Sequence, residues 1–458
     1  MSGVIGIYSK DRNDLSQIVY YGLYALQHRG QISCGMVVNN NDLIDYHKSL
    51  GLVQDVFSKE TIEGLIGNIA IGHVRHTSEN GGKDKNNVEP LAVGYKRGGL
   101  ALSLDGSIVN SKRLRKELEE KGNIFQTDLD GELIANLIAR YHDDNLQEAI
   151  IKVIKEISGS YSMTLMTSNK LIGARDPYGL KPLSLAKFND CYILSSETCA
   201  FDTIGGEFIR DIEPGEVVLI DESGVRTIFH KEKKKSRCLF EYIYFARPDS
   251  RLDGISVYKS RYQAGRELYR EHKSDADIVI GAPDSGIVGA IGYAKESKIP
   301  YAEGIIKNRY VGRTFIEPTQ ELREVGVRIK LNALNENIEG KKIILVDDSI
   351  VRGTTIKRTV DMLKKAGAKE VHVRIISPPI TNPCYLGFDL PSKDDLIAAR
   401  MNVEQIRNQI QADSLYYLSL EGLEKSIGGN DSFCRGCFIG QYPLENENLN
   451  KEEVGLCL

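Results

Sequence analysis

The sequence predicts a chain of mixed α+β and α/β class, with antiparallel sheets and packed helices in the N-terminal half and a doubly wound parallel sheet in the C-terminal half. Two observations lead to this prediction. Residues 171–197 alternate apolar and polar side chains between Gly, Pro and Asn-Asp breaks, as half-buried antiparallel strands do. Residues 341–379 follow the order strand, polar loop, helix, strand, which is typical of a parallel sheet whose ligands bind at the carboxyl ends of the strands.

The two halves meet at a charged tract, HKEKKKSR at residues 230–237, which we interpret as a solvated boundary and not as a nucleic-acid patch. It divides the chain into predicted domains 2–230 and 231–458. In the first domain, residues 110–122 and 130–144 have the apolar spacing of amphipathic helices. A chain of 458 residues is long enough for two or three domains with real cores.

Composition narrows the class of protein. The net charge of -4 and the pI near 6.1 argue against nucleic-acid or membrane-surface binding, which need an excess of basic residues. No apolar run approaches the roughly 20 residues of a membrane span, and the first residues do not have the layout of a signal peptide. We therefore expect a cytoplasmic enzyme.

The most informative segment is IILVDDSIVRGTT, residues 343–355, where an apolar strand ends on Asp347 and Asp348. The residues that turn the chain into a helix are Ser349, Arg352, Gly353, Thr354 and Thr355. Hydroxyls and free N–H groups at a helix start favour a phosphate dianion, and the acids can hold ribose hydroxyls beside a Mg²⁺ ion. An acid pair alone more often caps a helix, but the whole motif predicts a site for phosphoribosyl pyrophosphate (PRPP).

Two further loops suit the same ligand. Residues 281–294, GAPDSGIVGAIGYA, follow a strand and are small enough for the backbone to approach a pyrophosphate. Residues 305–331 carry the basic side chains Lys307, Arg309, Arg313, Arg323 and Arg328. Such a loop can close over a polyanion and exclude water. The alternative, an exposed basic loop, stays open on composition alone.

The eight cysteines are Cys34, Cys191, Cys199, Cys238, Cys384, Cys434, Cys437 and Cys457. Cys434 and Cys437 form a C-x-x-C pair, which alone fits a redox dithiol, a zinc knuckle or chance. Together with Cys238 and Cys384 they provide four thiolates, which suit iron–sulfur or zinc equally well. We interpret the other four as ordinary thiols.

The segments VDDSIVRGTT, GAPDSG, KNRYVGRTFIEPTQELREVGVRIKL and CLFEYIYFARPDS together resemble the glutamine phosphoribosylpyrophosphate amidotransferase family, which performs the first committed step of purine synthesis. The resemblance implies a type I phosphoribosyltransferase fold and PRPP binding by Asp284, Lys307, Arg309, Arg313, Asp347, Asp348, Ser349, Arg352, Gly353, Thr354 and Thr355. It implies Mg²⁺ at Ser285, Asp347 and Asp348. Glu317 stands where the family usually has Gln. Resemblance to the bacterial iron–sulfur subgroup implies a 4Fe–4S cluster on Cys238, Cys384, Cys434 and Cys437.

The segments SGVIGIYS, LQHRGQISCG, GHVRHTSENGG, LSLDGSIVN and GARDPYGLKPL resemble the family's N-terminal-nucleophile glutaminase, an αββα sandwich. The resemblance places the nucleophile at Ser2, the oxyanion site at Asp105 and Gly106, and glutamine binding at Arg75, Gly106 and Asp130. In this family the α-amine of the processed first residue is the base.

Three residues depart from the pattern of the glutaminase family. Ser2 replaces the cysteine nucleophile, Asp105 replaces the oxyanion asparagine, and His76 stands in the loop that follows Arg75. A hydroxyl ionises far less than a thiol, and a carboxylate accepts hydrogen bonds and opposes a developing oxyanion. Removal of Met1 is expected and would give Ser2 a free amine. We therefore hypothesise that glutaminase activity is weak or absent.

The leading prediction is an enzyme that converts PRPP and ammonia, from glutamine or free, to 5-phosphoribosylamine and pyrophosphate. One alternative is a divergent paralogue that uses free ammonia or another amine. Others are a non-catalytic PRPP or nucleotide sensor, which the complete set of catalytic loops disfavours, and a structural partner of an active homologue. The resemblance implies a homotetramer inhibited by purine nucleotides, and no nucleic-acid or membrane partner is expected.

Overall fold

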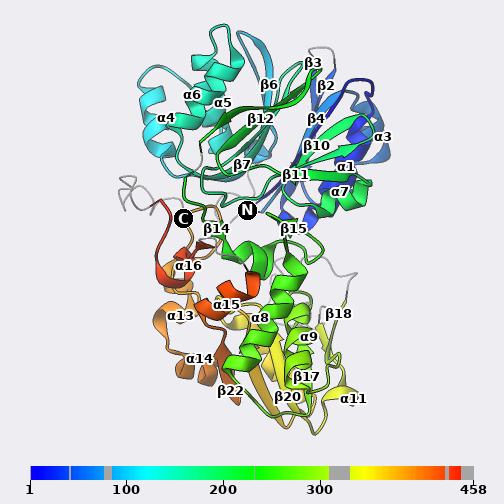
Figure 1. Cartoon of the computed structure of the whole chain (residues 1–458), viewed down its shortest axis with the longest axis vertical. Helices are drawn as coiled ribbons and strands as arrows, with labels where there is room; N and C mark the ends of the chain where they lie inside the picture. The colour runs from blue at the N-terminus through cyan, green and yellow to red at the C-terminus, as the bar shows by residue number, and fades with distance from the viewer. Residues whose placement is uncertain are drawn as a thin grey trace.

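The computed structural model describes residues 2–40, 43–76, 85–231, 233–308, 331–428 and 433–444. The chain forms two lobes placed end to end, with the N-terminal half in one and most of the C-terminal half in the other (Figure 1). No helix in these described ranges is long and apolar enough to cross a membrane.

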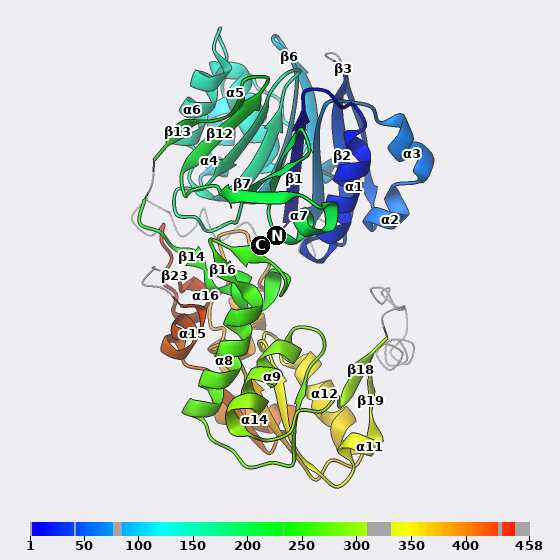
Figure 2. The ribbon, with the colours of Figure 1, turned by 45° about the vertical axis from the view of Figure 1, so that its right-hand side comes forward.

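Within the described residues the N-terminal lobe holds two antiparallel sheets, ordered β11-β9-β10-β1-β4-β2-β3 and β13-β12-β8-β7-β6-β5. The strands of the first sheet are β1 (Ser2–Ser9), β2 (Ser33–Asn40), β3 (Leu43–Leu50), β4 (Ile69–Arg75), β9 (Ser184–Phe188), β10 (Cys191–Ser195) and β11 (Glu207–Asp211). Those of the second are β5 (Leu91–Tyr95), β6 (Gly98–Ile108), β7 (Gly159–Met166), β8 (Leu171–Arg175), β12 (Glu216–Asp221) and β13 (Gly224–His230). The two sheets stack face to face (Figure 2).

Helices cover the outer face of each sheet. Beside the first sheet lie α1 (Leu15–Ala25), α2 (Val53–Val56), α3 (Lys59–Gly64) and α7 (Cys199–Ile204); beside the second lie α4 (Ser111–Glu119), α5 (Asp130–Tyr141) and α6 (Leu146–Glu156). One apolar core fills the space between the sheets, and two more lie under the helices. This is the predicted αββα sandwich, and α4 and α5 confirm the helices expected at residues 110–122 and 130–144.

The C-terminal lobe is built on a parallel sheet ordered β17-β20-β21-β22 in its described part. Its strands are β17 (Ile278–Gly281), β20 (Lys342–Asp347), β21 (Glu370–Ile375) and β22 (Ser414–Tyr417). The helices on its two faces are α8 (Val257–Glu271) and α9 (Gly286–Ser297), and α12 (Thr354–Lys365) and α14 (Val403–Ile410). Alternate residues of β20 enter the two cores, Ile344 beneath α8 and α9 and Ile343 beneath α12 and α14. The predicted doubly wound parallel sheet is confirmed.

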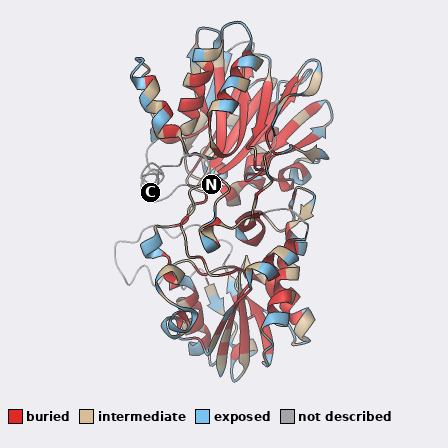
Figure 3. Cartoon of the chain, turned by 60° about the vertical axis from the view of Figure 1, so that its left-hand side comes forward, coloured by how far each residue is buried: buried red, intermediate tan, exposed pale blue. Residues whose placement is uncertain are grey.

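Short elements fill the junction and the sheet margin. They are β14 (Arg237–Cys238), the π-helical turn η3 (Glu241–Phe245), β15 (Arg251–Leu252), β16 (Ile255–Ser256), β18 (Ile305–Lys307), β19 (Leu331–Ala333), α11 (Asn335–Ile338), α13 (Ile397–Arg400), α15 (Leu420–Ile427), β23 (Phe433–Cys434) and α16 (Gly436–Ile439). β14 pairs with β23, so the late part of the chain returns to the junction. Buried residues follow the strands of both lobes and the helix faces turned toward them (Figure 3).

The crossing of α8 and α9 depends on glycine. A Cβ atom on Gly265 would lie 1.9 Å from the Gly289 carbonyl oxygen, far inside contact distance. We expect Gly265→Ala to lower the free energy of unfolding by about 1–3 kcal/mol, because the helices must separate to admit a methyl group. Gly64→Ala is the matched control, since a Cβ there meets no atom within 4 Å. Chemical denaturation measures both, and equal stabilities would contradict the proposed close packing.

Candidate active sites

The two predicted acids lie where β20 ends. Asp347 is the last residue of the strand, and Asp348 begins the loop that leads to α12. The buried Asp348 carboxylate accepts hydrogen bonds from the Ser285 hydroxyl at 2.6 Å and from the Ser349 hydroxyl. Ser285 precedes α9, after the neighbouring strand β17. The parallel pairing of β17 and β20 therefore brings two of the predicted ligand loops together.

The chemistry of these donors suits a divalent cation. Burial and the adjacent Asp348 carboxylate raise the pKa of Asp347 well above its ordinary value. A divalent cation would relieve the repulsion between the two carboxylates. Carboxylate and hydroxyl oxygens are the hard ligands that Mg²⁺ accepts, usually completed by substrate phosphates and water. Asp347, Asp348 and Ser285 thus fit the predicted ion.

The start of α12 offers backbone donors beside the acids. Gly353 precedes Thr354 with φ 79°, and no side chain caps the helix. A Cβ on Gly353 would also lie 2.7 Å from Ile397, so glycine suits both the turn and the packing. The first N–H groups of the helix, at Thr354 and Thr355, are available to an anion.

Only part of the predicted cationic loop lies within the described residues. Lys307 ends β18, and its ammonium group forms an ion pair with Asp284 in the β17–α9 loop. Arg352 lies 3.5 Å from Asp395. Outside the described residues lie Arg309, Arg313, Glu317, Arg323 and Arg328. Their predicted roles stay predictions.

The four predicted cluster cysteines converge on the junction. The pairing of β14 with β23 sets Cys238 opposite Cys434. Burial raises the pKa of Cys238 to about 12, and burial together with the other three thiols raises the pKa of Cys437. No three His, Cys, Asp or Glu side chains in the described ranges are grouped closely enough for one metal ion. A 4Fe–4S cluster differs from one ion, because its cysteines bind different iron atoms, and these four soft donors fit it.

At the predicted nucleophile position, Ser2 begins β1 and is buried. Its backbone nitrogen donates to Asp105 Oδ1 at 2.9 Å, and its carbonyl oxygen accepts from Arg29 Nε at 2.8 Å. Asp105 on β6 is fully buried and lies 3.1 Å from Arg29 and 3.4 Å from Lys181. Burial alone would raise the Asp105 pKa, but Lys181 and Arg29 bring it below its ordinary value. Asp105 is therefore an anion and an acceptor.

The backbone beside Asp105 is tightly packed. Gly106 has φ 139°, and a Cβ there would lie 1.9 Å from the Ser160 carbonyl oxygen. Gly387, from the C-terminal half, approaches the same glycine so closely that its own Cβ would lie 2.8 Å from the Gly106 carbonyl carbon. The Ser160 hydroxyl donates to the Leu386 carbonyl oxygen at 2.6 Å. The segment after Cys384 therefore packs against the predicted oxyanion position.

The predicted glutamine-binding residues lie around one short segment. Arg75 at the end of β4 donates to the Asn87 carbonyl oxygen and lies 3.8 Å from Glu89. The Asn87 side chain accepts from the backbone of Asp128, which leads into α5. Asp130 begins α5, is half-buried, and accepts from Ile108 N at 2.8 Å; burial raises its pKa. Residues 87–89 thus contact both Arg75 and the segment that leads to Asp130.

Sequence reasoning missed three charged residues of this region. Arg29, Lys181 and Glu241 lie in LQHRG, GLKPL and CLFEY, segments for which no charged contact was predicted. Arg29 donates to both Glu241 carboxylate oxygens, at 2.7 and 3.0 Å, although the two residues are 212 positions apart. For Lys181 and Glu241, a single charged residue within an otherwise apolar segment was the available signal.

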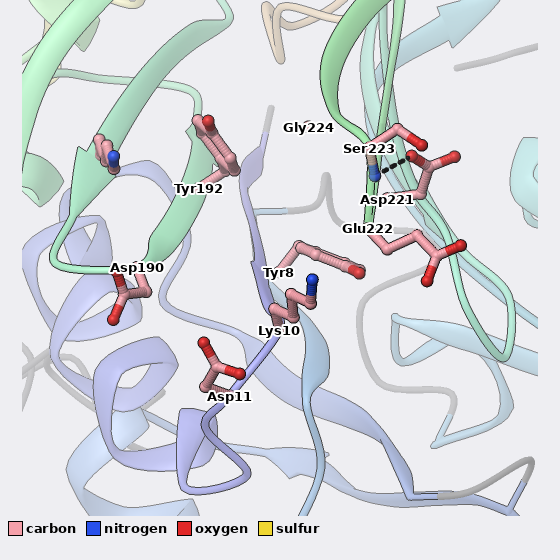
Figure 4. A pocket seen from close by; sticks show the side chains of 10 residues that line it. Tyr8, Lys10, Asp11, Asp190, Tyr192, Asp221, Glu222, Ser223 and Gly224 are labelled. Atoms are coloured by element: carbon pink, nitrogen blue, oxygen red, sulfur yellow. Dashed lines mark hydrogen bonds between the residues drawn. The ribbon is translucent and has the colours of Figure 1, made fainter.

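None of these residues lines the surface cavity of about 290 Å³ that is drawn in Figure 4. Its lining includes Tyr8, Lys10, Asp221 and Gly224, at the end of β1 opposite Ser2. The mixed charges that line it match none of the predicted contacts.

Comparison with known proteins gives the class of each lobe. Residues 75–203 match the glutamine amidotransferase domain family, and residues 257–379 match the phosphoribosyl transferase domain family. A glutaminase-type sandwich joined to a phosphoribosyltransferase sheet defines the class of protein.

Full-length relatives are also similar. The amidophosphoribosyltransferase of Archaeoglobus fulgidus is 48% identical over 97% of this chain and 98% of its own, and that of Bacillus subtilis is 46% identical over 97% and 94%. The solved structure of glutamine PRPP amidotransferase from B. subtilis, complexed with ADP and GMP, aligns with a TM-score of 0.90 at 46% identity, covering 96% of this chain and 97% of that chain. The chain belongs to the amidophosphoribosyltransferase family, and so to the phosphoribosyltransferase enzymes.

Proposed function

We propose that this protein transfers the phosphoribosyl group of PRPP to ammonia, giving 5-phosphoribosylamine and pyrophosphate, the first committed step of purine biosynthesis. The supporting observation is the placement of Asp347 and Asp348 at the end of β20, beside the uncapped start of α12. This arrangement offers acceptors for sugar hydroxyls and donors for a phosphate at one strand end.

The proposed binding mode assigns one part of PRPP to each group. Backbone N–H groups of Thr354 and Thr355 bind the 5-phosphate, and the two acids bind the ribose hydroxyls. Lys307 and the predicted Arg309 and Arg313 bind the pyrophosphate. A bound Mg²⁺ would neutralise the departing pyrophosphate. Ammonia then attacks ribose C1 from the opposite side, with inversion.

The nitrogen source is the second part of the proposal. Ser2 and Asp105 replace the thiol and the amide donor that the family uses, and the geometry around Asp105 favours an acceptor. We therefore propose that free ammonia, or ammonia from a partner glutaminase, serves this chain better than its own hydrolysis of glutamine. The second candidate function is transfer of the phosphoribosyl group to another amine, and the replacements at Ser2 and Asp105 motivate it equally.

Other proposed properties follow the family. We propose a structural 4Fe–4S cluster on Cys238, Cys384, Cys434 and Cys437, which would tie the chain's late segments to the junction. A homotetramer in the cytoplasm is proposed from the resemblance alone. Purine nucleotides are proposed inhibitors, because the B. subtilis relative was solved with ADP and GMP.

The proposed activity is tested by pyrophosphate release from PRPP with either nitrogen source. We expect turnover with ammonia and Mg²⁺, and turnover at least about 10²-fold slower with glutamine, since loss of one oxyanion donor alone costs about 10²–10³. Equal rates would contradict the proposal for the N-terminal lobe. Absence of turnover with ammonia, in protein that still binds PRPP, would favour the sensor.

A further inference from the structure

The Ser2 site is the centre of a buried network of charges. Arg29 lies 3.1 Å from Asp105, 2.6 Å from Glu197 and 2.7 Å from Glu241, and Lys181 lies 3.4 Å from Asp105. These side chains are at most 5% exposed, so water screens their charges little. Such charges need partners within the protein.

The cations of this network are shared unevenly among its acids, and Glu197 and Glu241 also interact with the buried guanidinium of Arg261. Glu197 has further donors at the network's margin, His28 at 2.7 Å and Ser250 at 2.6 Å. The Arg29 guanidinium is divided among all three acids. Asp105 is thus left with a shared guanidinium and the longer contact to Lys181.

The donor nearest to Asp105 is the Ser2 nitrogen, at 2.9 Å from Oδ1. Arg29 fixes the same residue from its carbonyl side, so the nitrogen has little freedom to turn away. Once Met1 is removed, this nitrogen is a primary amine, and an ammonium at this position would be the nearest cation to Asp105.

We propose that Asp105 holds the amino group of processed Ser2 as an ammonium ion, which removes the base from glutamine hydrolysis in this chain. An ammonium has no lone pair to accept the Ser2 hydroxyl proton. Asp105 is then a positioning residue that locks the N-terminal site. This inference deepens the proposed function, because it gives a reason for the reliance on free ammonia.

The other charged groups around the Ser2 nitrogen have partners of their own and do not cancel the effect of Asp105 on the amine. Arg75 lies opposite Ser2 in the β1–β4 register, but its guanidinium donates to the Asn87 carbonyl oxygen. His76, next along the chain, lies 3.4 Å from Asp389. Asp389 and Cys384, on the segment after β21, also face the N-terminus.

The direct test is titration of the amine in the unaltered protein. Mass spectrometry first establishes that Met1 is absent. In protein labelled with ¹⁵N-serine, the amine nitrogen resonates apart from the amides, and its shift reports protonation. An ordinary α-amine titrates near pH 7.7–8.0. We expect the Ser2 amine to remain protonated at least about one pH unit higher, because a carboxylate favours the charged form. An ordinary or lower value, or a retained Met1, would overturn the proposal.

Variants test the consequence for catalysis. Asp105→Asn removes the carboxylate that accepts from the Ser2 nitrogen, so the charged form of the amine loses its closest acid. On a Ser2→Cys background, we expect Asp105→Asn to speed glutamate release from glutamine at least about 10²-fold. Asp144→Asn on the same background is the matched control, since Asp144 is exposed. A double variant that releases glutamate no faster than Ser2→Cys would refute the proposed role of Asp105.

The pH profile separates the lock from a simple oxyanion defect. Glutamate release by Ser2→Cys should rise only at pH values above the raised amine pKa, whereas the double variant should reach its plateau earlier. Parallel profiles would mean that Asp105 opposes the oxyanion alone, and would overturn the proposal. Neither readout needs transfer from PRPP, so failure here is distinct from failure of the proposed transferase activity.

Discussion

Replacing Asp347 and Asp348 together by alanine should lower PRPP turnover with ammonia by about 10³-fold or more. Removing one preorganised electrostatic contact to a transition state typically costs about 10²–10³. The double change removes both proposed carboxylate ligands of the metal, at the end of β20 and the start of the following loop, and both acceptors for the ribose hydroxyls. Pyrophosphate release at saturating ammonia measures the loss.

The control for this pair is Asp275→Ala, an exposed acid that precedes β17 at the opposite edge of the same sheet. It should retain the parent rate, because the carboxyl ends of the strands lie elsewhere. The thermal midpoint of the double variant should not fall, since removing the repulsion signalled by the raised Asp347 pKa relieves strain. A double variant that keeps a tenth of the parent rate would contradict the proposed role of the acids.

Replacing Cys437 by serine should release the proposed cluster and destabilise the junction by several kcal/mol. The binding energy of a structural metal centre contributes directly to folding. Cys437 also holds the neighbouring chain, because its carbonyl oxygen accepts from the backbone nitrogens of Thr381 and Asn382 at 3.0 and 3.1 Å. Iron, sulfide and zinc assays on anaerobically purified protein, with denaturation curves, measure both effects.

Cys191→Ser is the matched control for the cluster, since Cys191 is fully buried on β10 and belongs to the sandwich core. It should lose some stability through its buried hydroxyl and keep its full iron content. Parent protein with neither iron nor zinc, or a Cys437→Ser protein with unchanged metal content, would contradict the cluster. Bound zinc without sulfide would instead favour a zinc site on the four thiolates.

The sheet of the C-terminal lobe was predictable because its signals are local. An apolar run followed by acids, a glycine and threonines specified both the end of β20 and the start of α12. The sandwich of the N-terminal lobe was less accessible, since alternating runs such as 171–197 predict strands but not their partners. β1 pairs with β4 and β10, which lie far along the chain, and the αββα prediction came from resemblance.

Contacts between the two halves could not be predicted from the sequence. Arg29 and Glu241 are 212 residues apart in the chain, and nothing in LQHRG indicates so distant a partner. The approach of Gly387 to Gly106 is equally nonlocal. Asp105 shows most clearly what the sequence could not predict. The sequence revealed a changed charge at a position known from the family. The contacts of Asp105 with Ser2, Arg29 and Lys181 became evident only in the structure.

The central claim is that the end of β20 forms a magnesium-dependent site for PRPP. Isothermal titration calorimetry of the intact protein with PRPP tests it most directly, with Mg²⁺ and with EDTA in parallel. We expect saturable binding with Mg²⁺, at least about tenfold weaker binding with EDTA, and loss of the magnesium-dependent part in the Asp347→Ala/Asp348→Ala protein. Binding of equal strength under all three conditions, or no binding by the intact protein, would contradict it.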